Sequence, residues 1–218
     1  KVPSPENALK TLMQHGWICV SEEADYRIPF EGAVEGKTVV LNREQQKAAE
    51  DIWRDDRQVH LLYGVTGSGK TEVYMNLIER VIGEGKQAIV LSPEISLTYQ
   101  NISRFRQRFG RRVSVMNSRM SDGERYDQYI QAKNGEIDIM IGPRSALFAP
   151  FSKLGIIIID EEQDGAYKSD TMPKYHAIDV AIRRTAMSGG KVILGSATPS
   201  VVTYDRACRG LYGLHRLS

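Results

Sequence analysis

The sequence is poor in cysteine and in long apolar runs, and both absences narrow the class of protein. Two cysteines, Cys19 and Cys208, among 218 residues are too few for a disulfide framework or a zinc cluster, so we expect a reducing, cytoplasmic setting. No apolar run approaches the roughly 18 residues of a membrane-spanning helix, and no stretch has the pattern of a secretory signal. We therefore expect no membrane partner.

The sequence also has little net charge. The formal charge is +2, so binding to nucleic acid would depend on local patches rather than on a global field. Fractions of 41% hydrophobic and 26% charged residues are typical of a globular protein. This length predicts one large α/β domain with a small appendage.

The most informative stretch is Gly64–Thr71, which fits the phosphate-loop spacing G-x-x-x-x-G-K-[ST]. The apolar segment 59–63 before it predicts a buried strand, and helical spacing of apolar residues follows it. An ordinary glycine-rich turn would not require Lys-Thr at that offset. The candidate nucleotide-binding residues of this loop are Gly64, Thr66, Gly67, Ser68, Gly69, Lys70 and Thr71.

The residue types in this loop explain the chemistry. Glycines allow backbone conformations and close approaches that side chains would block. Amides at the start of a helix, together with the helix dipole, favour an anion. Lys70 would reach the β- and γ-phosphates of ATP, and the Thr71 hydroxyl would ligate Mg²⁺.

A regular alternation of helices and strands begins at Leu41 and predicts a doubly wound, mostly parallel sheet over residues 41–218. The apolar run 155–159 is typical of a strand covered on both faces. The expected helices are 43–54, 70–83, 94–109, 121–133, 176–187 and 199–208. The expected strands are 58–63, 87–91, 112–116, 137–141, 155–159 and 191–195.

Residues 1–40 differ in character from the rest. Ser4-Pro5-Glu6 is typical of a helix start, and the helix would end at Gly16, before a strand at 17–20. A short helix that runs into a β-wing predicts the end of a winged-helix-like domain followed by a linker. An N-terminal docking arm is the alternative.

The second half of an ATP site is predicted by Asp160-Glu161-Glu162-Gln163-Asp164, directly after the 155–159 strand. A carboxylate at that strand end lies at the edge of the sheet where a nucleotide binds. Asp160 would hold Mg²⁺, and Glu161 would polarise the water that attacks the γ-phosphate. The alternative, an acidic helix start favoured by the helix dipole, is weakened by the phosphate loop upstream.

A glutamine before a phosphate loop is a candidate for recognising the base. Gln45 can both donate to and accept from the edge of adenine. The alternative is a solvated helix glutamine.

Further stretches follow predicted strands, and together they resemble a known family. The sequences of these segments, including the phosphate loop, are GVTGSGKTEVY, PEISLT, GPRSALF, IIIDEEQD and GSATPS. They are similar to motifs I, Ia, Ib, II and III of superfamily 2 helicases, and most of all to the PriA family of replication-restart DNA helicases. The resemblance is close over residues 41–218 and loose over 1–40. It implies a RecA-like first helicase lobe.

The resemblance also implies roles for single residues. Ser196, Ala197 and Thr198 match the motif that couples ATP hydrolysis to DNA contact. The residues matching motifs that line the DNA backbone are Pro93, Glu94, Arg144 and Ser145. Hydroxyls, amides and an arginine suit phosphate contacts, which position a strand without reading its sequence. The alternative is loop structure, with Pro93 ending a strand and Arg144 paired with a carboxylate.

An aromatic, lysine-bearing segment lies between motifs II and III. Tyr167, Lys168, Tyr175 and His176 match the loop that senses DNA in this family. Rings beside lysines suit base stacking next to phosphates. Alternatively, Tyr175 and His176 only begin the next helix.

The chain departs from the family pattern at three places. Gln163 replaces the usual histidine of the acidic motif, so this candidate catalytic residue can bridge by hydrogen bonds but cannot titrate. Pro143 stands where threonine is common, which removes a hydroxyl and an N–H. The aromatic loop has Pro173 near the place of a usual tryptophan.

The function implied is the ATP-binding lobe of a 3′-to-5′ helicase that remodels stalled forks and starts primosome assembly. Implied partners are single-stranded and forked DNA, primosome proteins and single-strand-binding protein, in a nucleoid-associated bacterial setting. We expect the chain to be part of a longer protein, with the second lobe, its arginine finger and a zinc-binding insertion elsewhere. An arginine finger can be worth about 10³–10⁵ in rate, so we expect this piece to bind Mg–ATP weakly and to hydrolyse it slowly or not at all.

Two alternatives stay open at this point. One is a different superfamily 2 DNA translocase. The other is a nucleotide-gated scaffold that binds DNA or partners with little catalysis, which Gln163 and Pro143 favour. Intact Lys70, Thr71, Asp160 and Glu161 argue against the scaffold.

Overall fold

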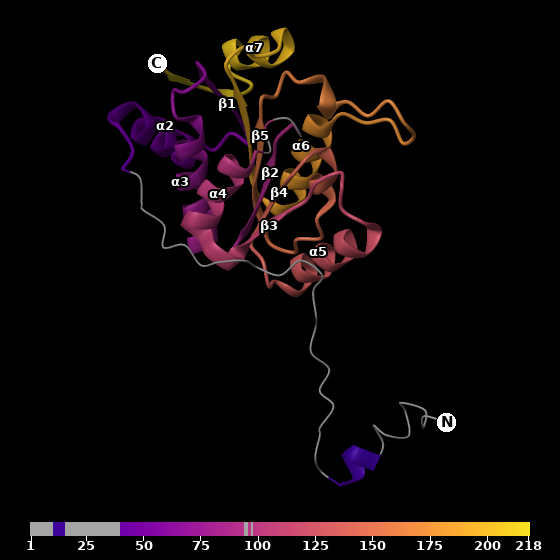
Figure 1. Cartoon of the computed structure of the whole chain (residues 1–218). Helices are drawn as coiled ribbons and strands as arrows, with labels where there is room; N and C mark the ends of the chain where they lie inside the picture. The colour runs from indigo at the N-terminus through magenta and orange to yellow at the C-terminus, as the bar shows by residue number, and fades with distance from the viewer. Residues whose placement is uncertain (1–10, 16–39, 94–95, 97) are drawn as a thin grey trace.

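The computed structural model describes residues 11–15, 40–93, 96 and 98–218 (Figure 1). Most of the segment expected to be winged-helix-like therefore lies outside the described residues; residues 11–14 are helical. The described helices and strands from residue 40 onward follow one another along the chain as α2 (Arg43–Arg54), β1 (Val59–Gly64), α3 (Lys70–Gly83), β2 (Gln87–Leu91), α4 (Tyr99–Phe109), η2 (Gly110–Arg112), β3 (Val113–Val115), α5 (Asp122–Asn134), β4 (Ile139–Gly142), η3 (Arg144–Phe148), β5 (Leu154–Asp160), η4 (Gly165–Tyr167), α6 (Ala177–Ser188), β6 (Lys191–Ser196), α7 (Val201–Cys208) and β7 (Gly213–Leu217).

Local signals explain where several helices begin and end. Asn42 caps α2 in a reciprocal capping box with Gln45, and Ser121 does the same for α5 with Glu124. The helix α6 ends at Gly189, whose φ of 68° is left-handed and favours glycine.

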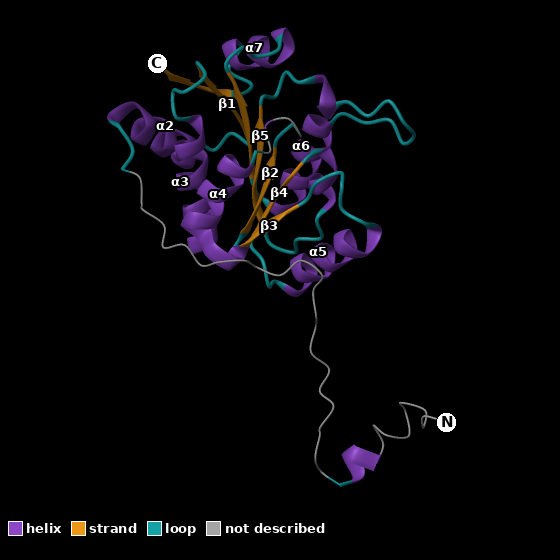
Figure 2. Ribbon diagram, in the orientation of Figure 1, coloured by secondary structure: helices purple, strands orange, loops and turns teal. Residues whose placement is uncertain are grey.

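The sheet has seven strands in the order β3-β4-β2-β5-β6-β1-β7, and every pairing is parallel. Helices cover both faces, with α2, α3 and α4 on one side and α5 and α6 on the other (Figure 2). The predicted doubly wound α/β fold is therefore confirmed.

Two hydrophobic clusters, one on each face, follow from the alternation along the strands. Leu61 and Ile157 belong to the cluster that contains Ala181 of α6. Leu62 and Ile158 belong to the cluster that contains Leu77 of α3. Because successive side chains of a strand point to opposite faces, a continuous apolar strand serves both cores.

Two expectations on the elements need correction. The helix expected at 94–109 begins at Tyr99, because the Thr98 side chain accepts from the Asn101 amide and caps it there. The seventh strand, β7, was not expected; it pairs with the outer edge of β1, with His60 opposite Gly213.

The strand order brings the expected motifs together. Since β1, β6 and β5 are neighbours, the phosphate loop, the segment after Ser196 and the acidic segment from Asp160 all leave one edge of the sheet. On the other side of β5 the ends of β2 and β4 follow, with Pro93 and Arg144 just beyond.

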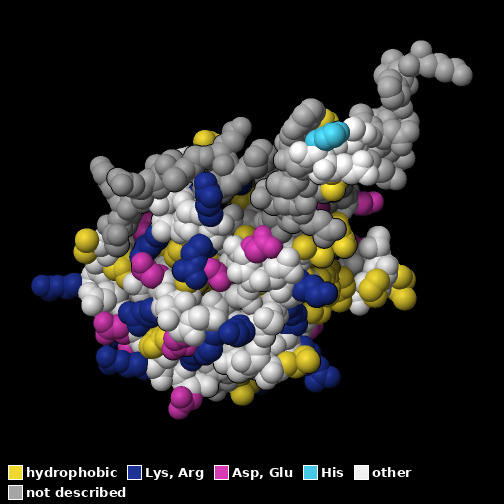
Figure 3. Space-filling model, turned by 90° about the horizontal axis from the view of Figure 1, so that it is seen from below, with side chains coloured by type: hydrophobic (Ala, Val, Ile, Leu, Met, Phe, Trp, Pro, Cys, Tyr) yellow, Lys and Arg dark blue, Asp and Glu magenta, His cyan; other side chains and the backbone are white. Residues whose placement is uncertain are grey.

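Charged side chains of both signs are interspersed over the face seen from below (Figure 3). This matches the small net charge of +2. No helix of the described residues is long and apolar enough to cross a membrane.

Candidate functional site

The phosphate loop joins β1 to α3 and has the backbone that an anion site requires. Gly67 and Gly69 have φ values of 87° and 84°, in the region that glycine favours. Val65, Thr66 and Gly67 are exposed, so the outer side of the loop is open. The loop therefore fits the predicted role of cradling phosphates with its amides.

Lys70 and Ser68 provide the polar side chains of this loop. The Lys70 ammonium donates to the carbonyl oxygens of Gly64, over 2.8 Å, and Val65, over 3.3 Å. Among the described residues, the Ser68 hydroxyl is buried without a hydrogen-bond partner. A buried, unpaired hydroxyl beside a lysine fits a phosphate group, because it otherwise carries an unmet hydrogen bond.

Gln45 contacts the phosphate loop from α2. Its amide nitrogen donates to the Ser68 carbonyl over 3.1 Å, and its amide oxygen accepts from the Asn42 backbone over 3.0 Å. A Cβ on Gly69 would lie 2.1 Å from that nitrogen, so glycine is required where the loop meets α2. Recognition of adenine by Gln45 stays a prediction.

Thr71 and Asp160, the predicted metal ligands, line the same small pocket between α3, α4 and the sheet, with a volume of about 30 Å³. The Tyr74 hydroxyl donates to Oδ1 of Asp160 over 3.0 Å. Burial raises the pKa of the Asp160 carboxyl. A divalent cation would favour its ionised form, so the donor set fits a metal that prefers oxygen ligands.

A chain of hydrogen bonds connects the acidic segment to the GSATPS segment. Gln163 donates to the Glu161 carboxylate over 2.8 Å and accepts from the Ser196 hydroxyl over 2.5 Å. The Ser196 hydroxyl in turn accepts from the Thr198 amide over 2.9 Å. Gln163 therefore bridges the two segments by hydrogen bonds.

Glu161 has an unusual backbone. Its φ of 51° is left-handed, which is uncommon for a residue with a side chain. Such conformations persist where the surrounding structure enforces them, often at functional sites. Glu161 thus stands at a constrained turn directly after β5.

Glu162 was not expected to anchor any other segment. Its side chain is 2% exposed and accepts from the Ser200 amide over 2.6 Å and the Thr203 hydroxyl over 2.9 Å. Glu162 thereby anchors the start of α7 to the acidic segment. The only signal in the sequence was a second glutamate beside Glu161.

Most of the residues expected at DNA line an open cleft beyond β2 and β4, with a volume of about 570 Å³, whereas His176 does not. The lining residues include Pro93, Arg144, Ser145, Lys168 and Tyr175; the expected contact Glu94 lies outside the described residues. The cleft also contains Asp164 and Asp170. Its surface is therefore mixed in charge.

Arg144 organises this cleft from η3. It donates to the backbone carbonyls of Ala166, over 3.1 Å, and Lys168, and its guanidinium lies 5.6 Å from the centre of the Tyr175 ring. The partners of Arg144 among the described residues are thus carbonyls and a ring, whereas the alternative interpretation expected a carboxylate.

The structure corrects the expected base-stacking role of Tyr167. Its side chain is 1% exposed, and its hydroxyl donates to the Asp160 carbonyl over 2.5 Å. A buried ring cannot stack on a base. His176 caps α6 by accepting from the Ile178 amide, as in the alternative in which it begins a helix, while Lys168 is exposed.

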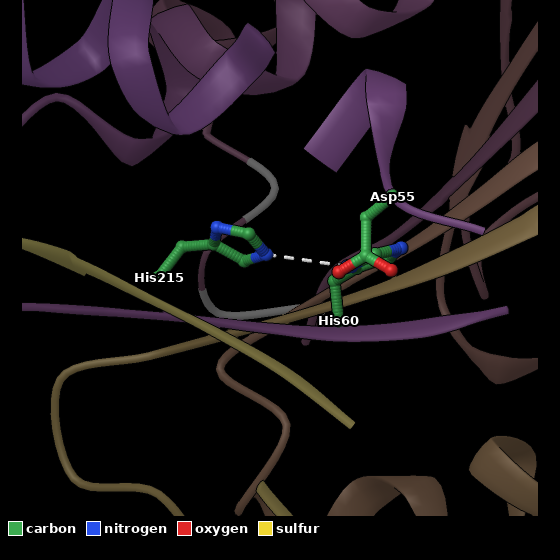
Figure 4. A group of neighbouring side chains, drawn as sticks. All are labelled: Asp55, His60 and His215. Atoms are coloured by element: carbon green, nitrogen blue, oxygen red, sulfur yellow. Dashed lines mark hydrogen bonds and ion pairs between the residues drawn. The ribbon is translucent and has the colours of Figure 1, made fainter. Parts of the chain in front are cut away.

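A second polar cluster lies away from the phosphate loop, where Asp55, His60 and His215 meet (Figure 4). Nδ1 of His60 is 3.2 Å from Nε2 of His215, and both rings are buried. Arg57 donates to both carboxylate oxygens of Asp55, and burial, together with the nearby charge of Lys191, lowers the pKa of His60 to about 4. These cations oppose a metal, so the histidine pair serves to fasten β7 to β1.

Comparison with known proteins identifies the family to which the chain belongs. The family model for the DEAD/DEAH box helicases matches residues 42–207. The chain belongs to this family. Membership implies ATP and a divalent metal in general, in agreement with the phosphate loop, Thr71 and Asp160.

The expected resemblance to PriA is also confirmed. The chain is 47% identical to the replication restart protein PriA of Bacillus subtilis over 98% of its own length. It is 48% identical to that of Chlamydia trachomatis over 96%. It spans only about a quarter of these relatives, 27% and 29% of their lengths.

The fold likeness extends to more distant helicases. The structure of RecG bound to a three-way DNA junction matches 98% of this chain and 26% of that chain, with a TM-score of 0.60 at 20% identity. At this identity the match supports the fold alone.

Proposed function

We propose that the chain is the ATP-binding first motor lobe of a PriA-type, 3′-to-5′ DNA helicase that acts at stalled forks. The observation that carries the proposal is the bridge from Glu161 through Gln163 to Ser196, beside the phosphate loop. A lobe that only stored nucleotide would need no link between the hydrolytic carboxylate and the GSATPS segment.

In this proposal different residues of the chain have different roles in binding and hydrolysing ATP. Mg–ATP, when bound, supplies the phosphoryl group that is transferred to water. Lys70 and the loop amides would hold phosphate oxygens, Thr71 and Asp160 would hold the metal, and Glu161 would orient water. Gln163 keeps the Glu161 carboxylate in line with Ser196, so a shift of the GSATPS segment would alter catalysis.

Single-stranded DNA would lie in the cleft beside Arg144, Ser145, Lys168 and Tyr175. A mixed-charge cleft with one partly buried ring suits contacts to the backbone more than base reading. Pro93 would contribute from the end of β2, and a contact by Glu94 stays a prediction from the sequence. The curated relatives that match this chain are named as replication restart proteins, which supports a DNA partner.

The wider setting follows from the PriA resemblance. Residues 1–40 would be the end of a winged-helix-like domain with its linker, and 41–218 the lobe itself. Forked DNA, primosome proteins and single-strand-binding protein would be partners in a bacterial cytoplasm, near the nucleoid. Mg²⁺ would serve this lobe, and zinc would bind only in a part of the full-length protein beyond these residues.

The nucleotide site is tested with a fluorescent ATP analogue and full-length protein. We expect Mg²⁺-dependent binding that weakens at least about tenfold in Lys70→Ala, because a charged contact to phosphate is lost. Lys47→Ala, an exposed lysine on α2, is the matched control. Equal affinity in the two variants would contradict the proposal.

A further inference from the structure

Two buried tyrosines, one before and one after Asp160 in the sequence, donate hydrogen bonds to it. Tyr74 of α3 donates to the side-chain Oδ1 over 3.0 Å, and Tyr167 of η4 donates to the backbone oxygen over 2.5 Å. Both tyrosine side chains are 1% exposed. Asp160 is therefore fixed at its carboxylate and at its main chain by groups that water does not reach.

Glycine at position 195 makes room for the Tyr74 hydroxyl. A Cβ on Gly195 would lie 1.6 Å from that oxygen and 3.3 Å from Oδ1 of Asp160. Gly195 is the first residue of the GSATPS segment, while Tyr74 lies in the helix after the phosphate loop. Three ATP-site segments thus meet at one hydroxyl.

Tyr167 is connected to the DNA cleft through its neighbours in sequence. The Arg144 guanidinium binds the carbonyls of Ala166 and Lys168, on either side of Tyr167. The buried ring of Tyr167 therefore lies between the cleft and Asp160. A tyrosine exposed for stacking could not make this connection.

We propose that Tyr74 is a positioning residue for the nucleotide's metal: by donating to Oδ1, it fixes the orientation of the Asp160 carboxylate that would hold the metal. This rests on the proposed ATP–metal site. Partners that fix a carboxylate ligand typically affect metal affinity by an order of magnitude. Tyr167 holds the main chain of the same residue, whereas Tyr74 donates to the carboxylate itself.

The experiment measures the affinity of full-length protein for a fluorescent ADP analogue, with Mg²⁺ and with chelator. We expect Tyr74→Phe to lose about tenfold in affinity with Mg²⁺ and to match the parent protein without metal. Electron paramagnetic resonance of Mn²⁺ should give a matching loss of Mn²⁺ affinity in the nucleotide complex. The control is Tyr212→Phe, which removes another buried hydroxyl, one bound by Arg206 over 2.7 Å.

Equal weakening with and without metal would overturn the proposal, because it would indicate a general structural defect. Unchanged Mg²⁺-dependent affinity in Tyr74→Phe would overturn it as well. If the parent protein itself showed no metal-dependent binding, the proposed ATP site would fail first. Urea unfolding of Tyr74→Phe, measured beside Tyr212→Phe, separates a general loss of stability from the metal-selective loss.

Discussion

The Ser196 hydroxyl donates to the side-chain oxygen of Gln163 over 2.5 Å, and Gln163 donates onward to Glu161. A glutamine can do this because its amide has both a donor and an acceptor end. The bridge needs no proton transfer, so replacing the family's usual histidine removes titration and keeps the connection.

Breaking this bridge should uncouple hydrolysis from DNA. Gln163→Ala in the full-length protein should lower the DNA-stimulated ATPase rate about tenfold, since it removes two hydrogen bonds of about 1 kcal/mol each, and leave nucleotide affinity unchanged. Gln107→Ala, on the exposed side of α4, is the control. A parental stimulated rate in Gln163→Ala would show that the bridge is not used.

Glu162 should matter for stability more than for chemistry. Glu162→Ala would remove the acceptor of the Ser200 amide and of the Thr203 hydroxyl at the start of α7, which costs about 1–3 kcal/mol of unfolding free energy. Glu162→Gln retains an acceptor and should lose less. Urea unfolding checks the order of the three proteins, and equal stabilities would refute the anchoring role.

The buried histidine pair should make the protein sensitive to acid. Burial and nearby Lys191 lower the pKa of His60 to about 4, and burial lowers that of His215. The neutral rings stabilise the fold fully above the unfolded pKa of about 6.5, and this stability is lost as pH falls from there toward 4.

For His60 the loss between pH 7.5 and pH 5 should be about 2 kcal/mol. The pH dependence of unfolding free energy should be smaller by that amount in His60→Gln. In His15→Gln, an exposed histidine, it should be parental. Identical pH profiles for all three would contradict the burial argument.

Arg144 should be important for single-strand binding. Arg144→Ala removes a charge from the cleft and the contacts to Ala166 and Lys168, so affinity for single-stranded DNA should fall about tenfold at low salt. Arg183→Ala, on the exposed face of α6, is the matched control. Titration with labelled oligonucleotides measures both affinities. Equal affinity of the two variants for single-stranded DNA would contradict the role of Arg144.

Much of the fold was predictable because its signals are local. The apolar runs at β2 and β5 and the phosphate-loop spacing specify strand, loop and helix without knowledge of the rest of the chain. The seventh strand was not predicted, because Gly213–Leu217 is short and includes the polar residues His215 and Arg216. Its place is decided by pairing with β1, a contact distant in sequence.

The sequence predicted what kind of site the chain carries, but it did not predict many of the contacts within that site. The convergence of Thr71 and Asp160 at one edge of the sheet could be predicted from motif spacing, since each motif follows a strand of one parallel sheet. The burial of Tyr167 could not, because an aromatic beside a lysine gives the same pattern in a core and at a surface. The anchoring by Glu162 depends on α7, far along the chain.

The most direct test of the motor lobe is single-strand-DNA-stimulated ATP hydrolysis by the full-length protein, measured beside Lys70→Ala and Gln163→His. We expect stimulated turnover that disappears in Lys70→Ala, and a changed degree of stimulation in Gln163→His. A protein that binds ATP and DNA yet shows no stimulated turnover would contradict this expectation and indicate a nucleotide-gated scaffold.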